Sequence, residues 1–128
     1  MILIISDRSD YSTSNVIDWL NHYHVEWVRL NAEIISGAQM RWNRKGSTEF
    51  TIESEGRKIQ SQQITKVWYR HGDMNYQLDL NQFPENEGIA NHMNYEWKTL
   101  VQSISSSLSE LPKIGNPAIG DDLNKLEV

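Results

Sequence analysis

The sequence predicts an open α/β fold with a mainly parallel, Rossmann-like sheet and helices on both faces. Three observations lead to this prediction. The chain opens with a continuous apolar run, Ile2 to Ile5, which is typical of a strand covered on both sides. A strand, a helix and a second strand follow one another within about thirty residues, the signature of a crossover unit in a parallel sheet. The period of hydrophobic residues then changes to two around residues 38–60, which indicates an antiparallel hairpin insertion.

The first helix is expected to start after the polar segment 7–11. Ser12 or Thr13 can cap it, because a side-chain hydroxyl accepts a hydrogen bond from a free amide of the first turn. The apolar residues that follow keep the three- and four-residue spacing of one helical face. They are Val16, Ile17, Leu20 and Tyr23. Residues 25–30 then form the expected second strand.

The insertion at 38–60 is expected to hold three short strands. Two polar breaks separate its alternating apolar residues, one at 43–47 and one at Glu55-Gly56, and glycine in such breaks accepts the positive φ of a hairpin turn. The segment 64–70 returns as a further strand whose end, Val67-Trp68-Tyr69-Arg70, is rich in residues that favour sheet interiors.

The second half of the chain is expected to contain a long loop at 71–86 and then the longest helix. Apolar residues recur every three or four positions from Ile89 to Leu111, and Pro112 ends the pattern. A short strand at 113–115 is expected to follow, and then a last helix capped by Asp121 or Asp122.

Composition excludes several classes of protein. A net charge of −5 argues against binding to nucleic acid or to an anionic membrane through bulk charge. The absence of cysteine excludes disulfides and thiolate metal sites. No apolar run approaches the roughly 20 residues that a membrane helix needs. We therefore expect a soluble cytoplasmic protein with neither nucleic acid nor membrane as a partner.

Familiar catalytic and phosphate-binding motifs are missing from the sequence. Neither a G-x-G-x-x-G turn nor a G-x-x-x-x-G-K-[ST] loop occurs, and no G-x-S-x-G elbow exposes a serine nucleophile. The four histidines do not have the spacing of zinc ligands. We therefore assign no catalytic residue and no metal site to this chain.

Two basic residues are candidates for ligand binding. Arg70 ends a predicted strand, and ligands of open α/β sheets bind beyond the carboxyl ends of strands, where a guanidinium can hold a carboxylate or phosphate. The alternative is that Arg70 pairs with an acid of the following loop, such as Asp73, and fixes that loop. Lys125, in the last predicted helix, is by itself an ordinary exposed lysine.

Six segments of the sequence carry a resemblance to a known family. They are Met1 to Asp7, Val16 to Leu20, Val67 to Arg70, Glu96-Trp97, Ile114 to Pro117 and Asn124 to Leu126. In these segments and in the order of its elements, the chain resembles the N-terminal, pre-ATP-grasp domain of ATP-grasp ligases. Within that superfamily it resembles the microviridin-type and grasp-with-spasm maturases of ribosomal peptides, and the resemblance runs from end to end.

The resemblance implies a role in a longer enzyme. Residues 1–128 would form a single N-terminal domain, with 121–128 beginning the helix that leads into an ATP-grasp region. In the family, ATP and magnesium activate Asp or Glu side chains of a precursor peptide as acyl phosphates, and ester or amide crosslinks follow. Lys125 and, less strongly, Arg70 would lie on the nucleotide side of the cleft. The domain alone would be non-catalytic and would bind no cofactor tightly, and a homodimer is possible for the intact enzyme.

Two other functions compete with this interpretation. A free-standing flavodoxin-like binding or signalling module would present acids after its first strand, where Asp7 and Asp10 stand, and an aspartate at the end of a central strand. The sequence has Arg70 at that second place. A structural adaptor would bind a peptide along the edge of the 38–60 hairpins.

Overall fold

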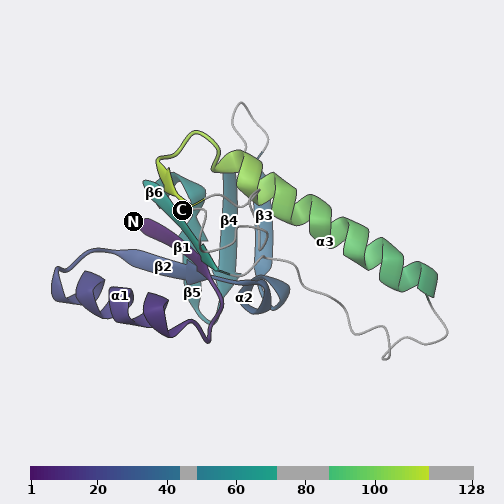
Figure 1. The fold of residues 1–128 in the computed structure, drawn as a ribbon. Helices are drawn as coiled ribbons and strands as arrows, with labels where there is room; N and C mark the ends of the chain where they lie inside the picture. The colour runs from purple at the N-terminus through teal and green to yellow at the C-terminus, as the bar shows by residue number, and fades with distance from the viewer. Residues whose placement is uncertain (44–48, 72–86, 116–128) are drawn as a thin grey trace.

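The computed structural model describes residues 1–43, 49–71 and 87–115, and Figure 1 shows its fold. The elements are, in chain order, β1 (Ile2–Ser6), α1 (Tyr11–His22), β2 (Trp27–Leu30), α2 (Ala32–Ser36), β3 (Gln39–Asn43), β4 (Glu49–Ser54), β5 (Arg57–Gln60), the 3-10 turn η1 (Ser61–Gln63), β6 (Lys66–His71), α3 (Glu87–Ser107) and β7 (Lys113–Ile114).

The first sheet is parallel and has the strand order β2-β1-β6-β7. It confirms the predicted parallel α/β layer. Strand β2 is shorter than the strand predicted at 25–30, because it begins at Trp27. His24, whose φ is 54°, turns the chain just before it, and Val25 remains 37 % exposed.

The predicted insertion forms a separate antiparallel sheet with the order β3-β4-β5. Its apolar residues pair across the strands, with Trp42 opposite Phe50 and Ile52 opposite Ile59. Residues at these positions point to one face of the sheet, because side chains alternate along a strand. Glu55 and Gly56 both have positive φ in the tight turn between β4 and β5, as a two-residue hairpin requires.

The main hydrophobic core lies between the two sheets. One face of the parallel sheet contributes alternate residues of β1, β2 and β6, and the antiparallel sheet contributes Phe50, Ile52 and Ile59. Ile35 of α2 and the carboxyl-terminal part of α3 complete this layer (Figure 1). The residues from the parallel sheet, from α3 and from the position directly after α3 are Leu3, Ile5, Val28, Leu30, Val67, Ile104 and Leu108.

Helix α1 covers the opposite face of the parallel sheet. Thr13 and Ile17 are its buried residues, and Ile4 is fully buried in the strand. The expected apolar face of this helix is partly wrong: Val16 is 38 % exposed and Tyr23 is 66 % exposed. The reason is the rotation of the helix about its axis, which turns the face with Thr13 and Ile17 towards the sheet.

The burial of helix α3 is uneven along its length, and Ala90 in its first turn is only 1 % exposed. Ile104 is fully buried, whereas Ile89 and Met93 of the same apolar stripe are 53 % and 43 % exposed. Figure 1 shows the amino-terminal half of this helix extending beyond both sheets. His71, the first residue of the loop expected at 71–86, belongs to β6 instead. Residues 72–86 and the expected last helix, with Asp121 and Asp122, lie outside the described residues.

Tyr69 joins the carboxyl-terminal part of α3 to β6. Burial raises the pKa of its phenol above the ordinary value, and a hydrogen bond with Ser105 offsets part of that effect. This contact and the buried side chains of Ile104 and Leu108 fix the end of α3 against the parallel sheet. The chain then turns back into β7 beside β6.

Candidate functional site

The carboxyl edge of the parallel sheet contains the arrangement in which open α/β proteins bind ligands. The chain runs from β1 outward to β2 on one side, and from β6 outward to β7 on the other. The neighbouring ends of β1 and β6 therefore flank the point where the strand order reverses, which is the usual binding crevice of such sheets. Ser6, the loop 7–10 and Arg70 lie there.

Asp10 caps α1. Its carboxylate accepts hydrogen bonds from the amides of Ser12 and Thr13, at 3.1 and 3.4 Å, and from the Thr13 hydroxyl at 2.7 Å. The expectation that Ser12 or Thr13 would be the cap is therefore wrong, because both residues donate to an acid that precedes them. A carboxylate at this position also interacts favourably with the positive end of the helix dipole.

Arg70 forms an ion pair with this cap. Its Nε lies 3.5 Å from Oδ2 of Asp10, and the two side chains are 36 % and 13 % exposed. The alternative considered from sequence, that Arg70 pairs with an acid of the following loop and fixes that loop, stays a prediction, because the observed pair is with an acid of another loop. The acid comes from the loop after β1, whereas Asp73 lies outside the described residues. The pair joins the ends of β1 and β6 across the switch point.

The pKa of Asp10 is lowered from its ordinary value. Burial acts to raise this pKa, but the hydrogen bonds from Thr13 and Ser12 and the positive charge of Arg70 together outweigh burial. The carboxylate is consequently held ionised, and a charged Asp10 stabilises the folded chain.

Arg29 is a third member of the site that sequence reasoning did not single out. It projects from β2, and its guanidinium donates to the Ser6 hydroxyl at 2.8 Å and to the Ser14 hydroxyl at 3.3 Å. It also donates to the backbone carbonyl groups of Asp7 and Asp10. The sequence did contain an indication of this role. Arg29 lies between the buried Val28 and Leu30, so its side chain must point to the other face of the parallel sheet, which α1 covers.

This arrangement can bind an anion. The guanidinium groups of Arg29 and Arg70 both bind Asp10, the residue that caps α1. The Arg70 side chain is 36 % exposed, so its guanidinium can also donate to a ligand carboxylate or phosphate. Lys125 lies outside the described residues. Among the described residues, no group of three or more histidine, aspartate or glutamate side chains has the geometry to hold a metal ion.

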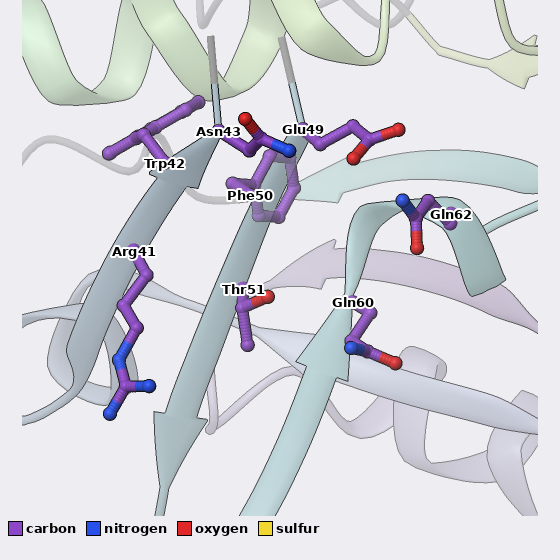
Figure 2. Close-up of a pocket in the computed structure, with 8 residues that line it drawn as sticks. All are labelled: Arg41, Trp42, Asn43, Glu49, Phe50, Thr51, Gln60 and Gln62. Carbon is purple, nitrogen blue, oxygen red and sulfur yellow. The ribbon is translucent and has the colours of Figure 1, made fainter. Parts of the chain in front are cut away.

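A separate polar groove of about 220 Å³ lies over the antiparallel sheet. Figure 2 shows Arg41, Thr51 and Gln60 on three neighbouring strands, and the strand register places them in one row. The groove also includes Trp42 and Phe50, whose ring centroids are 5.4 Å apart. It is formed by the insertion and not by the carboxyl edge of the parallel sheet.

No helix in the described ranges has the length and apolar character needed to cross a membrane.

The lowered pKa of Asp10 predicts how acid affects stability. The charged cap contributes stability above the unfolded-state pKa of about 3.9, and this contribution is lost as the pH falls through the lower folded-state value. We expect Asp10→Ala to cost about 1 kcal/mol at neutral pH. Asp10→Asn, which keeps a capping oxygen, should cost less. Urea unfolding between neutral and acidic pH should show the difference between wild type and Asp10→Asn shrinking towards low pH. A difference independent of pH would contradict the assignment.

Comparison with known proteins identifies relatives of this architecture. Residues 1–118 match the family described as MvdD pre-ATP grasp domain. The macrocyclase MdnB from Microcystis aeruginosa MRC has a similar fold, with a TM-score of 0.67 and 16 % identity over 91 % of this chain. The macrocyclase MdnC of the same organism, bound with precursor peptide MdnA, gives a TM-score of 0.67 and 18 % identity over 84 % of this chain.

A third similar structure is the RiPP-associated ATP-grasp ligase of Chryseobacterium gregarium, in complex with ADP and a leader and core peptide. Its TM-score is 0.61, with 22 % identity over 98 % of this chain. The aligned region is 41 %, 34 % and 38 % of the MdnB, MdnC and Chryseobacterium chains, so this chain spans well under half of each. No curated protein sequence matches it.

Proposed function

This chain belongs to the MvdD pre-ATP-grasp domain family, and from that membership we propose that it is the N-terminal domain of an ATP-dependent peptide maturase. The intact enzyme would use ATP and magnesium to phosphorylate Asp or Glu side chains of a ribosomal precursor peptide. A Ser or Thr hydroxyl, or a Lys amine, would then attack the acyl phosphate to form an ester or an amide and release phosphate. This domain would be non-catalytic and would form one wall of the cleft.

The observation that carries the proposal is the family match over residues 1–118. Two further findings support it. The structures of MdnC and of the Chryseobacterium ligase, which share this fold, contain bound peptides, and the second also contains ADP. At the switch point of the present sheet the Asp10 carboxylate is engaged by the cap of α1 and by Arg70, and an arginine stands where a signalling receiver would have its central aspartate.

Arg70 is the residue of the described chain best placed to face such a cleft. We propose that its exposed guanidinium neutralises negative charge at the rim, on the nucleotide side. Catalysis of phosphoryl transfer depends mainly on positioning and on charge neutralisation, so a fixed cation at the rim is useful without being a nucleophile or base. Lys125 would approach the phosphates from the segment that follows.

The reading frame that follows Val128 tests this proposal. We expect it to continue into a lysine-bearing sheet and then into strands that carry acidic magnesium ligands. The intact enzyme should remove one water from the precursor peptide for each crosslink, in an ATP-dependent reaction that mass spectrometry can follow. A stop codon directly after Val128, with no ligase frame downstream, would instead favour a free-standing module.

A further inference from the structure

Arg29 connects three successive parts of the chain at the carboxyl edge. Through the hydroxyls of Ser6 and Ser14 its guanidinium holds the end of β1 and the first turn of α1. Through the carbonyl groups of Asp7 and Asp10 it holds the loop between them. One side chain from β2 thus fixes the whole path of the chain from the first strand into the first helix.

Arg29 is half-buried, and the chemistry of its contacts differs from that of Arg70, which pairs with a carboxylate. All four acceptors are neutral, and in the part of the chain that the structure describes no carboxylate lies within ion-pair distance of Arg29. Its Nε is buried and has no hydrogen-bond partner. Shielding part of a guanidinium from water without a carboxylate partner costs free energy, which its four hydrogen bonds offset. Such an arrangement points to a positional task for this side chain.

We propose that Arg29 is a positioning residue, which holds the loop 7–10 so that Asp10 caps α1 and orients Arg70 towards the cleft. The link is direct. Arg29 donates to the backbone carbonyl of Asp10, while the side chain of the same residue binds Arg70. The orientation of Arg70 therefore depends on a residue that it does not touch. Only the identity of the ligand that Arg70 binds rests on the proposed function.

Two substitutions separate position from charge. Arg29→Gln removes both the charge and most of the fork, whereas Arg29→Lys keeps the charge but cannot donate to four acceptors in one plane. If Arg29 acts through position, both variants should raise the Asp10 pKa towards its ordinary value. Both should also speed solvent exchange of the Arg70 Nε proton. NMR titration of the Asp10 carboxyl and the side-chain signal of Arg70 measure these two quantities in the 128-residue chain.

Matched controls use Arg57, an exposed arginine at the start of β5. Arg57→Gln and Arg57→Lys should leave both signals at their wild-type values. Ser6→Ala is a milder variant for the case that Arg29→Gln does not fold, because it keeps every charge and removes only the 2.8 Å hydrogen bond to Arg29 and a bond to the Asp7 carbonyl. It should shift the signals in the same direction by a smaller amount.

These measurements test the positioning role of Arg29 in the 128-residue chain itself, without any ligase activity. Restoration of both signals by Arg29→Lys would show that charge alone is responsible and would overturn the proposal. Unchanged signals in Arg29→Lys and Ser6→Ala would overturn it as well. Because no nucleotide or peptide is present in these measurements, the positioning role can fail while the proposed function stands, and the reverse also holds.

Discussion

Replacing Ile104 by alanine is expected to lower the free energy of unfolding by about 2–5 kcal/mol. Ile104 is fully buried in the core between the two sheets, and its shortening leaves a cavity that the neighbouring strands can fill only in part. The expected loss is a large share of the total stability of a domain of this size. Urea unfolding followed by circular dichroism measures it.

Ile89 provides a matched control in the same helix. Its side chain is 53 % exposed, and Ile89→Ala makes the same chemical change without opening a core cavity. We expect an effect within about 0.5 kcal/mol, since alanine also favours helix slightly more than isoleucine. Equal effects at the two positions would mean that α3 does not pack on the sheets as described.

Gly115→Ala is expected to destabilise the chain by about 2–4 kcal/mol, from backbone strain and steric overlap together. Gly115 has a φ of 82°, and a Cβ there would lie 2.2 Å from the carbonyl oxygen of Tyr69. The oxygen belongs to the backbone of β6, so no side-chain rotation can relieve the overlap. We expect β7 to separate from β6, with loss of exchange protection at the Val67 amide, which donates to the Pro112 carbonyl.

Gly56 separates the two causes. It also has a positive φ, of 75°, but a Cβ at this position would meet nothing within 4 Å. Gly56→Ala should therefore cost only the backbone penalty of about 1–2 kcal/mol, and it should leave the Val67 amide protected. A cost at Gly115 no larger than the cost at Gly56 would contradict the close approach of β6 and β7.

The parts of the fold that could be predicted are those with a strong local signal. The apolar run at Ile2 to Ile5 reflects burial of a strand on both faces, and this strand lies within the parallel sheet. The alternation at 38–60 reflects burial on one face, and this segment forms the antiparallel sheet. The packing of one element on another was less visible. Val16 and Tyr23 have helical spacing with Leu20, yet the side of α1 that meets the sheet is chosen by tertiary packing.

The site shows the same limit. The place of Arg70 followed from topology, because a residue at the end of a strand next to β1 must lie at the carboxyl edge. Its partner could not be inferred, because Asp10 is sixty residues away in sequence and meets Arg70 only after β1 and β6 pair. Arg29 was missed for a similar reason, since a single polar residue within a strand gives no indication of how many acceptors it reaches.

Titration of this chain with Mg·ATP, followed by NMR, tests whether Arg70 lies on the nucleotide side of the cleft. We predict weak, millimolar binding without turnover, with signal changes confined to the loop 7–10, the first turn of α1 and Arg70, and we predict that Arg70→Gln abolishes them. Saturation at micromolar ATP would show a nucleotide site complete within this chain. Changes confined instead to the groove around Arg41 and Gln60 would place the ligand-binding surface on the antiparallel sheet. Either result would contradict a nucleotide-facing role for Arg70 at the carboxyl edge of the parallel sheet.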